Sequence, residues 1–360
     1  VYKRQVKVGR KGNAKWNFSE TFTWSSPGFD LNDMGYMKET DYLMNETEIM
    51  YRQTDIWKIF RYNAFTLSQK NMWNYGGTPF SNNASLRWQS MTMNRYEWDV
   101  KETFAWNWLD SRLLRGGPDV RFGSYFLTSA KFNTDKAKRM MFMLKYEGDH
   151  NFEGNRFNTI SPSLTFRLGN HVYLSGQLDY AWNTDEMQYV ATTSPLSSSS
   201  LTPYYYVMGH MDQKTYGLTL KLQVNVTPDI SIQFYGAPFT SIAKYDDFKL
   251  AADTKSHTFE NRFQRIDPDH LTYADGVYTI GEGAGQMPFR NPDFRFNEFR
   301  SNLVARWEYL PGSTLYFVWE HRMSNRDNWY SSGWGSNLDR MWGLPATNTF
   351  MIKMNYWFNL

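Results

Sequence analysis

Long stretches in which apolar and polar residues alternate at every second position most constrain what this chain can fold into. In the clearest stretch, residues 95–108, the even positions carry mostly aromatic side chains and the odd positions mostly charged or polar ones. Successive side chains of a β-strand point to opposite faces, so this pattern predicts a strand with one aromatic face and one charged face. The same alternation recurs in residues 171–183, 215–227 and 297–309.

This pattern predicts about fourteen strands, many of them ~11–14 residues long, the length that tilted strands need to cross a bilayer. The predicted strands are residues 14–25, 41–52, 57–70, 82–93, 95–108, 120–133, 137–147, 155–168, 171–183, 215–227, 229–236, 297–309, 313–322 and 347–360. Short turns alternate with long polar or glycine-rich connections, and the longest connections are residues 184–214, 237–296 and 323–346. We therefore predict an all-β fold, an antiparallel transmembrane β-barrel with short periplasmic turns and long extracellular loops. Residues 245–254 are expected to form one or two helical turns inside a loop.

Composition agrees with strands rather than helices in a membrane. The mean hydropathy is −0.63, and no run of about 20 apolar residues is present, which excludes a membrane-spanning helix. Aromatic residues make up 18% of the chain, a content that suits the aromatic belts of membrane strands. The net charge of +3 is too small to indicate a nucleic-acid partner, and the absence of cysteine excludes disulfides and thiolate chemistry.

Both ends of the sequence add expectations. The chain opens at Val1 without a signal-peptide pattern, so we interpret residues 1–360 as a single barrel domain from the C-terminal part of a longer protein. Apolar residues occupy every second position from Phe350 to Leu360. A last strand of this kind resembles the signal that the barrel-assembly machinery recognises. The expected location is the bacterial outer membrane, with lipid and that machinery as partners.

Several stretches resemble one family, the Bacteroidota outer-membrane barrels of unknown function that follow an N-terminal family-9 carbohydrate-binding-like domain. The matching stretches are residues 28–36, 115–118, 235–239, 244–248, 291–294 and 301–315. The resemblance implies an outer-membrane barrel that anchors or cooperates with a carbohydrate-binding-like module in the binding or uptake of glycans or other polymers. It also marks a set of family-motif residues, which we expect to have structural roles. These are Gly116, Gly117, Pro118, Pro238, Phe239, Tyr245, Trp307, Pro311 and Gly312.

The residues offer little catalytic chemistry. None of the six histidines has metal-ligand spacing, and no nucleophile elbow or phosphate-binding loop is present, so no cofactor or metal is expected and a non-enzymatic role is favoured. The candidate ligand-binding residues are Arg115, Trp329, Tyr330, Trp334 and Trp342. Two alternatives stay open. One is a soluble polysaccharide-active β protein. The other is a hydrolase at the rim of the barrel, using acidic and histidine residues that share the connection 237–296: Asp246, Asp247, His257, Asp267, Asp269 and His270.

Overall fold

The computed structural model describes residues 2–30, 40–106, 108–196, 204–328 and 334–358. It is 69% strand and 5% helix, which confirms the all-β class expected from the sequence. Among the described residues, no helix is long and apolar enough to cross a membrane.

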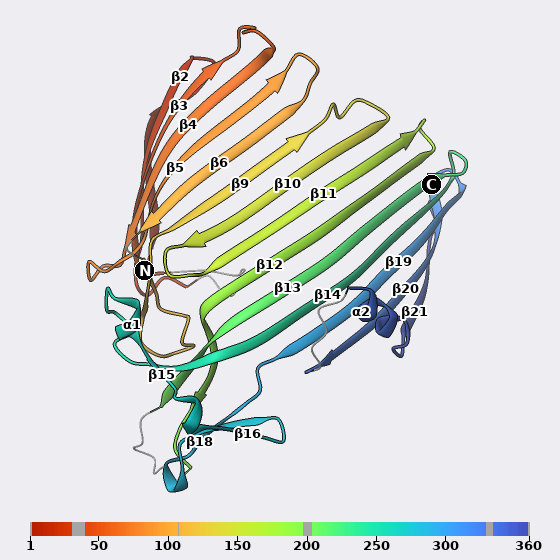
Figure 1. Ribbon diagram of the computed structural model, residues 1–360. Helices are drawn as coiled ribbons and strands as arrows, with labels where there is room; N and C mark the ends of the chain where they lie inside the picture. The colour runs from red at the N-terminus through yellow and green to blue at the C-terminus, as the bar shows by residue number, and fades with distance from the viewer. Residues whose placement is uncertain (1, 31–39, 107, 197–203, 329–333, 359–360) are drawn as a thin grey trace.

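One large antiparallel sheet makes up most of the molecule (Figure 1). Sixteen strands of the described residues form this sheet. Fifteen of them succeed one another in chain order, and the short β15 (Phe263–Arg265) pairs with the end of β14. The other strands of the sheet are β1 (Lys3–Arg10), β2 (Trp16–Ser25), β3 (Tyr42–Gln53), β4 (Phe60–Trp73), β5 (Pro79–Thr92), β6 (Glu97–Trp106), β9 (Tyr125–Asn133), β10 (Met140–Asn151), β11 (Arg156–Leu168), β12 (Val172–Thr193), β13 (Tyr205–Asn225), β14 (Ile230–Ala251), β19 (Phe294–Leu310), β20 (Ser313–Asp327) and β21 (Thr347–Asn355).

The smaller elements lie in the long connections. β7 (Trp108–Asp110) pairs with β8 (Val120–Phe122), and a three-stranded sheet follows the end of β14. The remaining elements are α1 (Phe259–Arg262), η2 (Pro268–His270), β16 (Leu271–Ala274), β17 (Val277–Ile280), η3 (Gly283–Gly285), β18 (Met287–Arg290) and α2 (Trp334–Trp342).

Each of the fourteen predicted strands overlaps a strand of the main sheet, and the predicted short turns fall on the edge that runs across the top of Figure 1 to its right side. The strand β1 lies outside the predicted set. Its alternation is weak, because among charged and polar neighbours only Val6 and Val8 are large and apolar. At the other end, the strand predicted to run to residue 360 ends at Asn355.

The predicted closure into a barrel is not formed by the strands that the structure describes. Among the described strands, β1 pairs only with β2 and β21 pairs only with β20, so this sheet is open. The described strands therefore form an open, antiparallel sheet of long strands.

Two of the predicted long loops are in large part strand. β12 continues to Thr193 and β13 begins at Tyr205, so much of 184–214 is an extension of the sheet. β14 continues to Ala251, so the prediction of helical turns at 245–254 is wrong. These extensions pack against the small elements that follow them and bury apolar side chains there, which favours strand over loop.

Pro238 explains why the sequence pattern suggests that β14 ends early. Proline has no N–H to donate and is normally confined to sheet edges or interruptions. Here β14 lies inside the sheet, but its pairing with β13 is interrupted between Gly236 and Phe239, while Pro238 remains paired with Phe299 on the other side. The missing donor therefore falls in a gap of the ladder, and the strand continues.

The two faces of the main sheet differ sharply. We call the apolar face the side that carries Trp98, Leu164, Leu178, Leu220 and Phe317, whose side chains remain 38–44% exposed. We call the other side the polar face; it carries the ion pairs Arg87–Asp99 and Lys145–Glu147 and the hydrogen bond from Ser161 to Asp179. Among the described elements, α2 covers only one end of the apolar face, over β14, β19 and β20.

Candidate ligand-binding site

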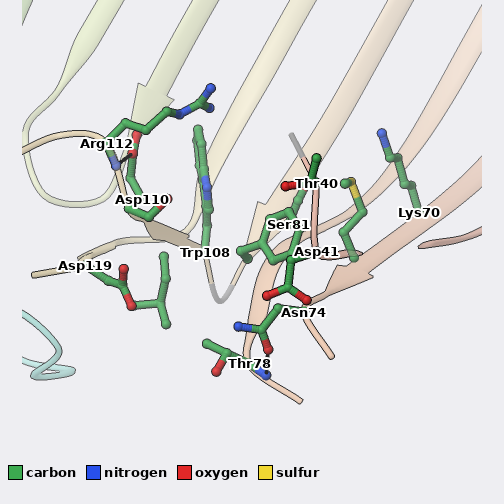
Figure 2. A pocket seen from close by; sticks show the side chains of 14 residues that line it. Thr40, Asp41, Lys70, Asn74, Thr78, Ser81, Trp108, Asp110, Arg112 and Asp119 are labelled. Atoms are coloured by element: carbon green, nitrogen blue, oxygen red, sulfur yellow. Dashed lines mark hydrogen bonds between the residues drawn. The ribbon is translucent and has the colours of Figure 1, made fainter. Parts of the chain in front are cut away.

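A cavity of about 600 Å³ opens at the edge of the sheet that carries the long connections. Its walls come from the start of β3, the β4–β5 turn and the β7–β8 segment. Figure 2 shows the Trp108 ring between the turn that carries Asp110 and the side that carries Asp41. The cavity therefore combines an indole ring with carboxylates and with the side chain of Lys70, which stands on the polar face of β4.

The aromatic wall is held in place from behind. The Trp108 ring lies parallel to the Phe122 ring, with centroids 5.2 Å apart, and contacts the Tyr125 ring at 5.5 Å. Leu109 and Val120 of the β7–β8 pair are buried. This packing orients the indole before any ligand arrives, which lowers the entropy lost on binding.

The β4–β5 turn forms the opposite wall through local hydrogen bonds. The Asn74 side chain accepts from the Thr78 amide at 2.8 Å, and Gly77 supplies the positive φ that the turn needs. Asp41 precedes β3 in a left-handed conformation, and its Oδ1 accepts from the Tyr75 amide at 3.1 Å. That hydrogen bond ties the start of β3 to the end of β4.

The acidic side chains on the other wall are also fixed. Asp110 Oδ1 accepts from the amides of Arg112 and Leu113 at 2.7 and 3.1 Å. Asp119 forms an ion pair with Lys255 at 3.0 Å, and its backbone carbonyl accepts from the Thr254 hydroxyl. The segment after β14 is thereby joined to the cavity wall.

An apolar core lies beyond the main sheet, on the same edge as the cavity. We call it the second core, because it is separate from the faces of the main sheet. The extensions of β12, β13 and β14 pack there against the three-stranded sheet and the segment 108–122. Arg262 of α1 is fully buried and forms a two-pronged ion pair with Glu153, whose carboxylate also accepts from the Gly123 amide at 3.0 Å. The Arg262 guanidinium also donates to the Arg121 carbonyl. These contacts join the long connections to one another beyond the edge of the sheet.

Two carboxyls in this region carry shifted pKa values. Burial raises the pKa of Asp185, although the hydrogen bond from the Met187 amide opposes the shift. Burial likewise raises the pKa of Asp293, against the hydrogen bond that its carboxylate accepts from the Tyr245 amide at 2.7 Å. Asp185 lies on the extension of β12 and Asp293 lies just before β19, so both groups are at the edge that carries the long connections.

The structure places Arg115 against an aromatic ring. The carbon of its guanidinium lies 4.6 Å from the Tyr189 ring centroid, a cation–π contact. Arg115 and Gly116 both have positive φ, and a side chain at Gly117 would meet Leu114 and the Tyr206 ring. The motif 115–118 thus makes a sharp turn that packs onto the β12 and β13 extensions, and Pro118 follows it on the surface.

Of the four predicted aromatic binding residues, Trp342 is the one whose side chain lies in the described part of the chain, and it does not line the cavity. Trp329 and Tyr330 lie outside the described residues, and Trp334 begins α2. Trp342 ends α2 on the apolar face, where its ring meets Phe299 edge-on at 4.9 Å. Trp342 is 55% exposed, so its position resembles that of an interface aromatic more than that of a cavity wall.

The other motif residues have structural positions. Tyr245 is buried in the second core, and Phe239 packs against Phe296 across β14 and β19. Trp307 is half exposed on the apolar face near the short-turn edge. Pro311 and Gly312 form the β19–β20 turn, where Gly312 has a φ of 77° and lies against Trp357.

The acid–histidine cluster 267–270 is a solvated turn. Asp267 accepts from the Asp269 amide at 3.0 Å and starts the short helix η2, and every residue of η2 is exposed. In the described ranges, no group of three acidic or histidine side chains is arranged to hold a metal ion.

The residues that line the cavity were not among those that the sequence singled out. Trp108 stands at the end of a predicted strand, where its alternation indicates only a face of the sheet. Asp41, Lys70 and Asp110 come from three separate segments of the chain. Only the pairing of β3, β4, β5 and β7 brings them together, so no spacing in the sequence could have revealed them.

These features define a class of protein: an antiparallel sheet of long strands with one apolar face and one polar face, and with a polar cavity at the edge of its long connections. The family model of a domain of unknown function, DUF5916, matches residues 2–360, so the chain belongs to this family. No curated protein and no solved structure shows a significant match. The expected resemblance is confirmed at the level of a domain of unknown function; the N-terminal carbohydrate-binding-like domain stays a prediction.

Proposed function

We propose that this sheet is part of the wall of an outer-membrane β-barrel and that the cavity at its long-connection edge binds a glycan or a similar polyhydroxylated polymer. In this proposal the apolar face contacts lipid, the polar face lines a hydrated interior, the short turns are periplasmic and the long connections are outside. The last strand, β21, engages the barrel-assembly machinery, and the role is non-catalytic.

The observation that carries the membrane part is the uncovered apolar face. Leu178, Leu220 and Phe317 stand on interior strands of a large sheet, yet each is 39–44% exposed. In water, a layer of helices or a second sheet normally covers such a face, because burying a large apolar side chain stabilises a fold by roughly 1.5–3 kcal/mol. Hydrocarbon supplies the same cover without a second protein layer.

The cavity supports the ligand class. A buttressed indole offers a flat apolar surface, which suits the apolar face of a pyranose ring, while Asp41, Asp110 and Asn74 offer hydrogen-bond partners for hydroxyls. Carboxylates and cations are both present in the walls, which favours a neutral or weakly charged polyol over a strongly charged ligand.

The membrane part is tested by extraction and electrophoresis of the full chain expressed with an outer-membrane signal. The proposal requires that the protein enter solution only with detergent and that its gel mobility differ between heated and unheated samples. A protein that is fully soluble without detergent would refute it.

The ligand part is tested by binding of the detergent-solubilised protein to an array of neutral and acidic oligosaccharides. Trp108→Ala is expected to abolish binding, whereas Trp342→Ala, which removes an exposed tryptophan from the apolar face, is the matched control and should bind as the parent does. Equal binding by both variants, or no binding by the parent protein, would contradict the assignment of the cavity.

A further inference from the structure

A compact group of polar side chains interrupts the apolar face in the middle of β2–β5. We call this group the mid-strand polar patch. It consists of Glu20, Asn45, Thr47, Gln69, Asn71 and Asn82.

The strand register arranges the patch in two neighbouring rows across the sheet. One row contains Glu20, Thr47 and Gln69, and the next contains Asn45, Asn71 and Asn82. Apolar rows of the same face border the patch on both sides. They consist of Trp24, Leu43 and Trp73 toward the long-connection edge, and of Phe18, Ile49, Leu67 and Leu86 toward the short-turn edge.

Hydrogen bonds within the patch leave polar groups facing outward. Both carboxylate oxygens of Glu20 accept hydrogen bonds, one from the Asn45 amide and one from the Thr47 hydroxyl at 2.6 Å. Among the described residues, Glu20 has no ion-pair partner, and Gln69 is exposed. The patch therefore presents a carboxylate at one side and side-chain amides at the other.

A lipid-facing position would make this patch costly. Its rows lie midway between aromatic rows that stand where a membrane strand has its interface belts. A carboxylate and several amides at that depth lose their hydration and gain nothing from hydrocarbon. A surface with hydrogen-bonding groups at the same depth would remove this cost.

We propose that a second copy of this chain covers the mid-strand polar patch, with the two copies related by a two-fold axis along the membrane normal. This inference rests on the membrane position proposed above. A second copy inserted in the same direction brings its own patch to the same depth, which an unrelated partner would have to match separately.

The chemistry of the patch is self-complementary. Rotation about an axis that passes between β3 and β4 exchanges the two sides of the patch. The Glu20 carboxylate of one copy then turns toward the side of the other copy that carries the Asn71 amide, which can donate to it. No cation from a third component is needed.

The size also fits. Four strands ~4.8 Å apart and five residue rows ~6.7 Å apart cover ~600 Å² on each copy, or ~1,200 Å² in total, the lower end of the range for specific interfaces. The apolar rows on either side would pack against their counterparts and seal the polar centre.

Cross-linking provides a direct test, because the chain contains no cysteine. The full chain is reconstituted at low protein-to-lipid ratio with Gln69→Cys, which lies near the proposed axis, and treated with a short bifunctional maleimide. Leu220→Cys is the control, because Leu220 is equally outward and exposed but stands on the apolar stretch of β13. We expect Gln69→Cys to give a covalent dimer and Leu220→Cys to give none.

A further variant tests the polar contacts. Adding Glu20→Leu to Gln69→Cys should lower the dimer fraction about tenfold, a change equivalent to ~1.4 kcal/mol and within the range for polar contacts between membrane segments. Heat-dependent mobility of each variant, measured in the same samples, reports whether it has folded into the membrane.

The outcomes separate the two proposals. Detergent-dependent, heat-modifiable protein that gives no Gln69→Cys dimer would overturn the dimer and leave the membrane assignment standing. An equal yield from Leu220→Cys would also overturn the dimer, since it would indicate random collision. Protein that is soluble without detergent would overturn the membrane assignment, and the dimer with it.

Discussion

The Arg262–Glu153 ion pair gives the sharpest prediction about how the long connections are held. Arg262 is fully buried, and the Glu153 side chain is 13% exposed. Replacing Arg262 with Met keeps much of the side-chain volume but leaves the Glu153 carboxylate nearly buried without its cation. Breaking a buried pair in this way typically costs ~3–5 kcal/mol.

The cost should appear locally rather than globally. Arg262 joins α1 to the carbonyl of Arg121 and to the β10–β11 turn, and none of these contacts involves the middle of the main sheet. We therefore expect hydrogen exchange of the amides in residues 252–265 to become at least about a hundredfold faster, which corresponds to ~3 kcal/mol of lost local stability. Amides in the middle of β13 should exchange as before.

A double-mutant cycle supplies the control. Adding Glu153→Gln to Arg262→Met removes the orphaned charge, so the double variant should recover a large part of the lost protection. Unchanged exchange in 252–265 for the single variant would refute the argument. So would a double variant whose loss equals the sum of the two single losses, because the side chains would then not act as a pair.

Three further predictions concern the same region. Burial raises the pKa of Asp293, so the folded state binds the proton more tightly than the unfolded state does. The second core should therefore gain stability as the pH falls from above the raised pKa toward 3.8. Asp293→Asn should remove this dependence, as measured by thermal unfolding between pH 4 and 7. A stability that falls on acidification through this window in the parent, but not in the variant, would contradict it. Gly117→Ala should destabilise the 115–118 turn by ~1–3 kcal/mol, because its Cβ would lie 2.7 Å from Leu114 and Tyr206; unaltered proteolysis of this turn would count against the reasoning. Phe289→Ala should cost ~3–5 kcal/mol, because Phe289 is buried against Phe248 and Tyr278, and it should make the three-stranded sheet protease-sensitive while the main sheet stays intact.

The long strands with one apolar and one polar face are the elements that the sequence predicts best. The alternation in residues 95–108 identifies both the strand and its aromatic face, since the side-chain period of a strand is set by local geometry. The sequence-based prediction fails at β1, where charged residues mask the alternation, and at the end of β14, where Gly236 and Pro238 look like an interruption. There the pairing gap opposite β13 accommodates the proline, and that gap is a property of two strands together.

The sequence does not predict the candidate site, for a related reason. Its lining residues belong to the β3 start, the β4–β5 turn and β7, and each is an ordinary loop or strand-end residue by itself. The motif residue Arg115, by contrast, is easy to notice in the sequence, yet in the structure it stacks on Tyr189 and completes a turn.

The sequence alone determined the strand class, the order of turns and long connections, and which residues share a face, because these follow from a two-residue period and from turn chemistry within a few positions. The tertiary structure decided how far β12, β13 and β14 extend, which segments make the cavity, and that Glu20 stands among amides on the apolar face. These features depend on register between strands that are distant in the chain, and register is set by the packing of whole faces rather than by any one segment.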